Sequence, residues 1–340
     1  MIERGPWRIT FDTNPDDCNL SCIMCERFSK YAPKVSGKPR RMNFQIISRV
    51  ISEAAQLGLR EIIPSTMGEP LLYRNFKNIV DLCHEYHLSL NVTTNGTWPR
   101  MSPSQWAEVI CPVTSDVKIS WNGATAETQE AIMVGSKFDW HLNDLIAFIS
   151  VRDELYRNGE NRCNITLQCT FMERNLSEIP DIIKLASKLG IDRVKGHHIW
   201  VHTSEMESDN LRRNKKSRQR WNSTVRECWQ VASEYPRNNG VAVKLDNFTL
   251  LPLVDQDVLQ ASWICPFLGK EAWINAEGRF DPCCAPDIER KTLGFFRHVN
   301  EPGSLEAIWT SKKYLTLTKK YMNNEVCQKC TMRRPKKESP

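Results

Sequence analysis

The chain has 340 residues, a formal net charge of +6 and 41% hydrophobic residues, which is an ordinary composition for a folded globular protein. It has no apolar run near the ~20 residues that a membrane-spanning helix requires, so we expect no membrane partner. Its basic stretches, Lys30–Arg41, Leu211–Arg220 and Arg333–Lys337, are typical of solvated surface, and nothing in the sequence resembles a nucleic-acid-binding module.

The first informative motif follows the short β-rich run Arg8–Phe11. Cys18, Cys22 and Cys25 stand as C-x3-C-x2-C. Thiolates are the usual ligands of iron–sulfur clusters, and three thiolates on a four-iron cluster leave one iron open for a small molecule. A structural zinc site takes four protein ligands, typically as two separated pairs. The spacing therefore favours a cluster, with a fragmentary zinc site as the alternative.

After the cysteine triplet, the sequence alternates between strand-like and helix-like segments. Beyond Arg8–Phe11, the pattern predicts strands over Glu61–Ser65, Ser89–Thr94, Val117–Trp121, Asn164–Phe171 and Arg193–Ile199, and helices over Asn43–Leu57, Phe76–Tyr86, Pro103–Ile110, Ala126–Met133, His141–Arg157 and Ile179–Leu189. About six such units indicate an α/β protein with a parallel sheet and helices outside it.

Turn sequences close several of the predicted strands. Gly68-Glu69-Pro70 follows the second strand, Asn95-Gly96 the third, and Asn122-Gly123 the fourth. Each is a common turn sequence by itself. In this order after the cysteine triplet, they resemble the cofactor-binding set of the radical S-adenosylmethionine (radical SAM) enzymes.

The resemblance implies a partial (β/α)6 TIM-like barrel over roughly Pro6–His202, with its chemistry at the C-terminal ends of the strands. It implies that Cys18, Cys22 and Cys25 hold a [4Fe-4S] cluster. The open iron of that cluster would chelate the amino and carboxylate groups of S-adenosyl-L-methionine (SAM).

The same resemblance implies a set of residues around SAM. Backbone groups of Met67, Gly68 and Glu69 would receive the methionine amino group. Thr94 and Asn95 would line the cofactor pocket, Ser120 would contact ribose or carboxylate, and Gln168 is a further candidate for a polar contact. Two departures stand out, because Met24 replaces an aromatic residue and no arginine occurs in Glu130–Gly135.

The C-terminal third carries a second cysteine pattern. Cys265, Gly278 and Cys283 form C-x12-G-x4-C, and Cys327 and Cys330 form a closing C-x2-C. A glycine before the second cysteine suits a tight turn that brings two thiolates together. Zinc held by four cysteines is the alternative interpretation.

This pattern resembles the twitch domain, a shortened form of the SPASM extension of radical SAM enzymes. The resemblance implies that the four cysteines ligate one auxiliary [4Fe-4S] cluster, which gives two clusters in total. We expect a radical SAM core over residues 1–205, a basic linker with a helical or strand extension over 206–255, and a twitch domain (β-hairpin plus helix) over 256–340.

The remaining cysteines divide into two kinds. Cys284 adjoins a predicted cluster ligand and is a candidate hydrogen donor to a substrate radical. The others are interpreted as buried free thiols, namely Cys83, Cys111, Cys163, Cys169 and Cys228. Because iron–sulfur clusters need a reducing compartment and the first residues show no signal-peptide pattern, we expect a cytoplasmic protein.

The resemblance implies an enzyme of oxidoreductase or epimerase type that cleaves SAM to a 5′-deoxyadenosyl radical and takes hydrogen from a substrate carbon. We expect a small polar and possibly anionic substrate, such as a sugar, aminocyclitol or nucleotide-sugar, followed by dehydrogenation, epimerisation or elimination. The partner would be an electron donor such as flavodoxin or ferredoxin. The alternatives are crosslinking or epimerisation of a ribosomally made peptide, disfavoured by the lack of a leader-binding domain, and a non-enzymatic iron–sulfur or zinc scaffold.

Overall fold

The computed structural model of the chain describes residues 4–34, 37–65, 67–253, 262–285, 287–330 and 332–334. These residues belong to two compact units. The first contains residues 1–16, 39–90 and 258–340, and the second contains residues 17–38 and 91–257. The first unit is thus assembled from three separate stretches of the chain.

The first unit is built on strand β1 (Arg8–Phe11), which pairs in parallel with β2 (Glu61–Ile63) and with β8 (Glu271–Ile274). β2 also pairs in parallel with the start of β3 (Ser89–Thr94), and β8 pairs antiparallel with β9 (Phe280–Asp281). A hairpin from the C-terminal third therefore extends the sheet that begins at the N-terminus.

Opposite charges stabilise this pairing. The register places Arg8 beside Glu61 on one side and Glu271 on the other. The Arg8 guanidinium forms ion pairs with both carboxylates, at 2.9 Å for Glu271. Such pairs across neighbouring strands favour one register over its alternatives.

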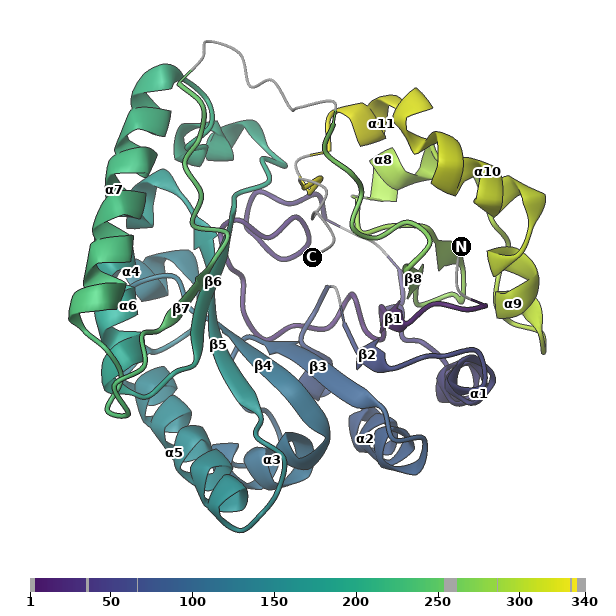
Figure 1. Ribbon diagram of the computed structural model, residues 1–340, viewed down its shortest axis with the longest axis horizontal. Coiled ribbons are helices and arrows are strands. Elements are labelled where there is room, and N and C mark those ends of the chain that lie inside the picture. The colour runs from purple at the N-terminus through teal and green to yellow at the C-terminus, as the bar shows by residue number, and fades with distance from the viewer. Residues whose placement is uncertain are drawn as a thin grey trace. The chain divides into compact units, whose positions relative to one another are not determined.

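The helices of the first unit come from its second and third stretches. They are α1 (Phe44–Ala55), α2 (Phe76–Glu85), α8 (Asp287–Lys291), α9 (Ser304–Trp309), α10 (Lys312–Lys320) and α11 (Glu325–Gln328), labelled in Figure 1. Asn43 caps α1 by accepting a hydrogen bond from the backbone N–H of Gln45. The buried face of α1 carries Ile47, Val50 and Ile51 at helical spacing, so the predicted amphipathic helix is confirmed.

The second unit contains four parallel strands with helices on one side of them (Figure 1). The strands are β4 (Thr114–Ser120), β5 (Asn164–Phe171), β6 (Arg193–His198) and β7 (Lys244–Asp246), and the helices are α3 (Pro103–Ile110), α4 (Ala126–Ile132), α5 (Phe138–Arg157), α6 (Ile179–Lys188) and α7 (Lys215–Glu234). Hydrogen-bonded neighbours give the strand order β7-β6-β5-β4-β3-β2-β1-β8-β9, an open sheet. The predicted α/β fold, a partial TIM-like barrel, is confirmed.

The predicted elements differ from the structure mainly at their ends. β3, α3 and β5 have the predicted bounds, whereas β4 begins at Thr114 rather than at Val117. In the segment expected to be a basic linker with an extension, α7 is followed by β7, which pairs in parallel with β6. This segment therefore adds a further helix–strand unit to the sheet. The domain boundaries at 205 and 255 stay a prediction.

Two arginines of the basic stretches are not solvated, contrary to the prediction. Arg218 and Arg333 are only 2% and 3% exposed. Arg218 donates to the carbonyl oxygen of Arg212 at 3.0 Å, and Arg333 donates to the carbonyl oxygens of Trp263 and Gln328 at 3.1 and 2.9 Å. Both guanidinium groups act as internal hydrogen-bond donors. Lys336 and Lys337 lie outside the described residues.

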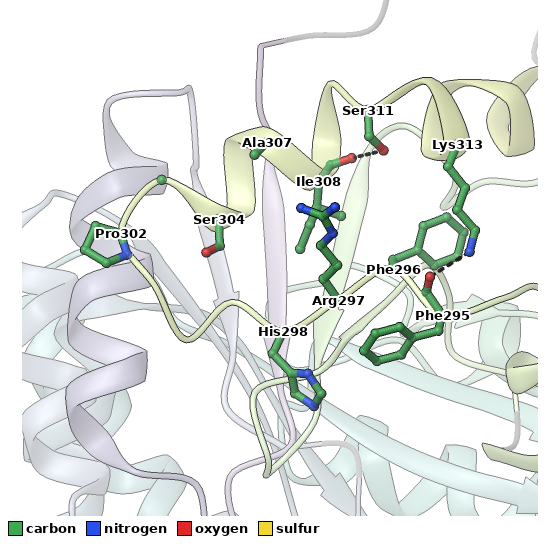
Figure 2. A pocket seen from close by; sticks show the side chains of 11 residues that line it. Phe295, Phe296, Arg297, His298, Pro302, Ser304, Ala307, Ile308, Ser311 and Lys313 are labelled. Atoms are coloured by element: carbon green, nitrogen blue, oxygen red, sulfur yellow. Dashed lines mark hydrogen bonds between the residues drawn. The ribbon is translucent and has the colours of Figure 1, made fainter.

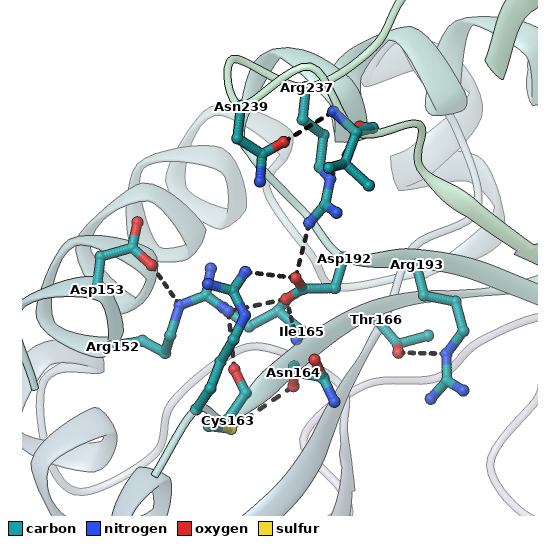
Figure 3. A network of polar contacts seen from close by, with 12 residues as sticks. Arg152, Asp153, Cys163, Asn164, Ile165, Thr166, Asp192, Arg193, Arg237 and Asn239 are labelled. Carbon is teal, nitrogen blue, oxygen red and sulfur yellow. Dashed lines mark hydrogen bonds and ion pairs between the residues drawn. The ribbon is translucent and has the colours of Figure 1, made fainter. Parts of the chain in front are cut away.

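A cluster of arginines around Asp192 joins α5, β5 and the start of β6 (Figure 3). The Asp192 carboxylate accepts hydrogen bonds from Arg152, Arg162 and Arg237 at 2.6 to 2.9 Å, and from the backbone N–H of Ile165 at 3.0 Å. Burial by itself would raise the pKa of Asp192, but these bonds and charges outweigh it and lower the pKa. The carboxylate therefore stays ionised and stabilises the second unit.

No helix in the described part of the chain is long and apolar enough to cross a membrane.

Candidate iron–sulfur and cofactor sites

The first cysteine set lies in a loop that follows β1 in the sequence. Cys18, Cys22 and Cys25 are all half-buried free thiols. The backbone N–H of Cys25 bonds the carbonyl oxygen of Cys22 at 3.0 Å, which closes a turn around the second and third cysteines. The Cys25 sulfur accepts hydrogen bonds from the backbone N–H groups of Arg27 and Phe28, both at 3.4 Å. Amide donors of this kind stabilise a metal-bound thiolate.

The three thiols lie close enough to influence one another. Burial, followed by the proximity of Cys18 and Cys25, raises the pKa of Cys22 to about 12. Metal ligation requires the thiolate form, so a positively charged group at this point would relieve the repulsion. The donor set and its hydrogen bonds fit a cluster that is held by three thiolates.

Apolar packing and backbone pairing fix the loop within the second unit. The backbone N–H groups of Ser21 and Ile23 bond the carbonyl oxygens of Val134 and Ile132 at 2.9 and 3.0 Å, at the end of α4. Met24, which replaces an expected aromatic residue, packs with Cys18 and Cys22 against a buried apolar cluster. That cluster contains Leu20, Ile23, Ile132, Met133, Met172, Ile199 and Met206.

Asn95 connects the end of β3 to the cysteine loop. Its side-chain amide donates to the Cys18 sulfur at 3.7 Å and to the Asn19 side-chain oxygen at 2.9 Å. Its own oxygen accepts from the backbone N–H and hydroxyl of Thr97 at 3.0 and 2.7 Å. The sequence predicts a pocket-lining role for Asn95, and the structure adds that it orients Cys18. Thr94, which ends β3, is buried, and its hydroxyl accepts from the N–H of Gly96.

Ser120 and Gln168 are direct neighbours on the parallel strands β4 and β5. The backbone carbonyl of Gln168 accepts a hydrogen bond from the N–H of Trp121 at 2.8 Å. Its side-chain oxygen, in contrast, is buried and has no partner among the described residues. A buried acceptor without a partner is costly, so this atom is suited to a ligand hydroxyl or amine.

A polar network fills the row of side chains before Ser120 and Gln168. Asp116 on β4 accepts from the hydroxyl of Thr166 at 2.6 Å and forms an ion pair with Arg193. Arg193 also pairs with Asp246 on β7 at 2.9 Å. These groups satisfy one another, so the free polar atoms of this face lie nearer the C-terminal ends of the strands.

Two further residues of the same face, Lys195 and His197 on β6, were not predicted from the sequence. The register places Lys195 beside Gln168, and His197 beside Thr170. Loss of hydration among the surrounding groups, followed by the charge of Lys195, lowers the pKa of His197, whose side chain is still exposed to solvent. The sequence did contain a pattern that indicates this face. Polar and apolar or small residues alternate in the run Arg-Val-Lys-Gly-His, and in a strand alternate side chains lie on one face.

The predicted methionine-binding turn lies in the first unit. Glu69 is only 1% exposed, and its carboxylate accepts from the backbone N–H of Leu71 at 3.1 Å. The carbonyl oxygens of Met67 and Glu69 accept from the Ser65 hydroxyl and the Asn14 amide at 2.7 and 2.8 Å. The Glu69 carbonyl also accepts from the backbone N–H of Leu72 at 3.0 Å, so of the two carbonyls only that of Met67 keeps a second lone pair for a ligand among the described residues. Gly68 has a φ of 74°, which favours glycine.

The second cysteine set is assembled entirely within the first unit. Cys265, Cys283, Cys327 and Cys330 are half-buried free thiols. Burial raises the pKa of Cys283 to about 12, with further contributions from the other three thiols of the set. Burial, followed by the thiols of Cys265 and Cys330, raises the pKa of Cys327 to about 11. Four mutually interacting thiols fit the auxiliary cluster that the sequence predicts.

Contacts outside the motif hold this second set together. The backbone groups of Ile264 and Arg334 exchange two hydrogen bonds, at 2.8 and 3.0 Å. The backbone N–H of Cys265 donates to the Tyr321 hydroxyl at 3.2 Å. Arg333 bonds carbonyl groups on both sides of the set, as described above. These contacts place the chain around Cys265 beside the closing C-x2-C.

The other cysteines agree with their predicted environments, and Cys284 is exposed. Cys83, Cys111, Cys163, Cys169 and Cys228 are buried free thiols, as predicted. Within the described ranges, no three His, Cys, Asp or Glu side chains converge closely enough to hold a single metal ion. The thiolates of a cluster bind separate irons, so they need not converge as the ligands of one ion do.

Two family models match the chain. Residues 15–212 match the radical SAM superfamily, and residues 265–331 match the SPASM family, described as an iron–sulfur cluster-binding domain. The first match covers more than half of the chain, and the second includes all four cysteines of the C-terminal set.

Two curated relatives match different extents of the chain. The mycofactocin maturase MftC of Mycolicibacterium smegmatis is 26% identical over 186 residues, which are 54% of this chain and 41% of that protein. The chain thus spans less than half the length of this relative. A protein of Pyrococcus furiosus described as modifying the cofactor of a tungsten-containing aldehyde ferredoxin oxidoreductase is 22% identical over 332 residues, covering 93% of this chain and 85% of the relative.

Solved structures share the fold at low sequence identity. Streptococcus suis SuiB bound to S-adenosylmethionine has a TM-score of 0.66 and 15% identity, covering 97% of this chain and 71% of SuiB. The protein anSMEcpe with bound AdoMet has a TM-score of 0.64 and 14% identity, covering 96% of this chain and 86% of that one. Both similarities support the open α/β barrel described above.

Proposed function

The chain belongs to the radical SAM superfamily, and on that premise we propose that it uses SAM to abstract a hydrogen atom from a carbon of a peptide substrate. Membership implies a [4Fe-4S] cluster and SAM, and the C-terminal match implies an auxiliary iron–sulfur centre. When bound, the reduced cluster supplies the electron that splits the carbon–sulfur bond of SAM into methionine and a 5′-deoxyadenosyl radical.

Three thiolates and two sets of hydrogen-bond donors form the proposed cluster site. Cys18, Cys22 and Cys25 are the proposed ligands, and the match of residues 15–212 to the radical SAM superfamily, which includes all three, is the observation that carries the proposal. Asn95 donates to the Cys18 sulfur, and backbone N–H groups donate to the Cys25 sulfur. These donors orient the ligands and stabilise their negative charge, in the manner of outer contacts at other metal sites.

The side-chain oxygen of Gln168 is the proposed acceptor for a SAM hydroxyl or amine. It is buried without a partner among the described residues, and Ser120 stands next to it in the strand register. Together they offer one acceptor and one hydroxyl, which suits the ribose of SAM. Thr94 and the backbone of Met67, Gly68 and Glu69 stay predicted contacts of the same cofactor.

The proposed auxiliary site consists of the four C-terminal cysteines. Their positions favour a single [4Fe-4S] cluster of the twitch type, for a total of two clusters per chain. Cys284 stays a proposed hydrogen donor because its thiol is exposed directly beside Cys283. The fate of the substrate radical, whether oxidation or hydrogen return, depends on these groups.

A peptide is the favoured substrate because a relative that is 26% identical over 186 residues is a maturase by name. This reverses the preference for a sugar or aminocyclitol that the sequence alone suggested. A small polar molecule stays the second candidate, since the relative with near full-length coverage is described as cofactor-modifying. An electron donor such as flavodoxin or ferredoxin completes either reaction.

One experiment separates the two substrate classes. The protein is reconstituted anaerobically with iron, sulfide and SAM, reduced with dithionite, and assayed for 5′-deoxyadenosine with and without substrate. We expect a short peptide encoded beside this gene to raise the yield and to change in mass, while nucleotide-sugars do not. Stimulation by nucleotide-sugars alone would support the second candidate, and no 5′-deoxyadenosine under any condition would refute SAM cleavage.

A further inference from the structure

A groove in the C-terminal part of the first unit is not used by either cysteine set. It is a cavity of about 430 Å³ between the loop around Phe295–His298 and the helices α9 and α10 (Figure 2). Ligand sites commonly have volumes of ~300–1,000 Å³, so the groove has room for a few side chains.

The charged groups of the groove are all basic. Arg297, His298 and Lys313 line it, and none of its lining residues is acidic. Arg297 makes no side-chain hydrogen bond or ion pair within the described residues, and Figure 2 shows it extending from the loop toward Ile308 on α9. Lys313 donates to the carbonyl oxygen of Phe295 at 2.7 Å and keeps donors for a ligand. The groove therefore favours an anionic occupant.

Apolar groups lie beside these charges. Phe295 is 56% exposed, a large value for a phenylalanine that lines a cavity. Its ring contacts the His298 ring with centroids 5.4 Å apart, and the Lys313 ammonium lies 5.1 Å from the Phe296 ring. An occupant with both carboxylates and apolar side chains would match this surface.

The backbone of the groove also has an open edge. Phe280 N–H bonds the carbonyl oxygen of Arg297 at 3.0 Å, and Val299 N–H bonds that of Gly278 at 2.7 Å. His298 pairs with Arg279 between these two bonds, so its own N–H and C=O point away from Arg279. Neither group has a partner among the described residues, and extended peptides bind to edges of this kind.

The backbone at Arg297 is strained. Its φ is 81°, in the left-handed region that non-glycine residues rarely adopt. This conformation directs the Arg297 side chain into the groove while its carbonyl oxygen stays bonded to Phe280. Strained residues are maintained where the geometry serves a site.

We propose that this groove binds an extended, acidic segment of a peptide substrate. Carboxylates of the segment pair with Arg297 and Lys313, an apolar side chain packs on Phe295, and its backbone adds to the edge at His298. The inference rests on the proposed peptide-directed function and names the chemistry of the peptide. A folded acidic electron carrier is the competing occupant, but a concave groove with an open strand edge suits an extended chain better.

The test uses the full chain and a fluorescein-labelled decapeptide of alternating glutamate and leucine, with anisotropy as the readout. We expect binding that weakens with salt, and no binding of the lysine–leucine counterpart. The double variant Arg297→Glu/Lys313→Glu should bind at least about tenfold more weakly, because it replaces two attractions with repulsions. The matched control Lys319→Glu/Lys320→Glu carries the same charge change on α10 outside the groove and should bind as the wild type does.

Two further variants keep the test decisive. Arg297→Gly accepts the positive φ without strain and removes the charge, and Lys313→Arg keeps the charge, so we expect weaker binding in the first and full binding in the second. Equal loss in the Lys319/Lys320 control, or unchanged binding in the double variant, would overturn the proposal. The proposal would also be overturned if labelled flavodoxin binds in a Lys313-dependent manner and the peptide does not bind.

Peptide binding in the groove and the proposed function can be refuted independently of each other. Anisotropy reads peptide binding without any turnover, whereas stimulation of 5′-deoxyadenosine by peptide reads the function. If the peptide binds but does not stimulate 5′-deoxyadenosine formation, the groove is a peptide-binding site and the peptide-substrate proposal is refuted. If peptide stimulates 5′-deoxyadenosine formation equally in the wild type and in the Arg297→Glu/Lys313→Glu variant, a peptide is the substrate but it binds outside this groove.

Discussion

The two cysteine sets differ in how the fold brings their members together. Cys18, Cys22 and Cys25 stand in one short loop, and local turns and the neighbouring Asn95 arrange them. The C-terminal set combines Cys265 and Cys283 with a closing pair more than forty residues later. A local motif can be recognised and formed with few supporting contacts, whereas an assembled site depends on every contact that joins its segments.

The largest expected effect is at the local set. Replacing Cys18, Cys22 and Cys25 together by alanine should abolish 5′-deoxyadenosine formation, because no thiolate stays to hold the cluster. The C-terminal set should keep about half of the iron of the wild type. The matched control is Cys228→Ala, which removes a buried thiol of the same unit. SAM cleavage at the wild-type rate in the triple variant would contradict the assignment.

The next effect concerns the assembled set. Cys283→Ala should lower the iron content from about eight to about four per chain, because one ligand of the auxiliary cluster is lost. The variant should still cleave SAM at a measurable rate in the absence of substrate. Cys83→Ala, a buried thiol of the first unit, is the control. Zinc in place of iron at this site, found by elemental analysis, would show a four-cysteine zinc site instead.

Arg333→Ala should sharpen the distinction between local and assembled sites. It removes the two hydrogen bonds from the Arg333 guanidinium to the carbonyl groups of Trp263 and Gln328, each of which contributes about 1 kcal/mol. We expect weaker iron binding at the C-terminal set and a lower urea midpoint, with the N-terminal set unaffected. Lys320→Ala, on an exposed side chain, should change neither. Equal iron loss from both sets would contradict independent assembly.

Asn95→Ala tests a side chain that supports the local set. Loss of its hydrogen bond to Cys18 should slow SAM cleavage by about tenfold while the iron content stays full, as for other outer contacts of metal ligands. Thr97→Val removes a hydroxyl that bonds the Asn95 oxygen and should give a smaller effect in the same direction. Unchanged cleavage in Asn95→Ala would limit Asn95 to a structural role.

Cys284→Ala is expected to have the smallest effect on SAM cleavage, since the residue is exposed and lies outside both ligand sets. Its donor role is tested separately by turnover in deuterated water. If the Cys284 thiol returns a hydrogen atom, the wild type places one deuterium in the product and the variant loses that product. A product oxidised by two electrons without solvent deuterium at carbon would exclude the donor role.

Much of the fold was predictable because its signals are local. The bounds of β3, α3 and β5 follow from turn residues and capping groups, such as Ser102 before α3, that lie next to the elements. The segment that forms α7 and β7 was predicted only as a basic linker with a helical or strand extension, because its strand is three residues long and its helix is rich in charge. Its pairing with β6 is a long-range contact that no short pattern encodes.

The sequence by itself determined the two cysteine sets and the α/β alternation, and it predicts the cluster ligands, because each depends on residue type and short spacing. Tertiary structure decided which polar groups those ligands meet. The fold places the Asn95 amide against the Cys18 sulfur, leaves the Gln168 side-chain oxygen without a partner among the described residues, places Lys195 and His197 on the same face, and buries Arg333. Hydrogen bonds and burial between distant segments are set by strand register and packing, so only the folded chain reveals them.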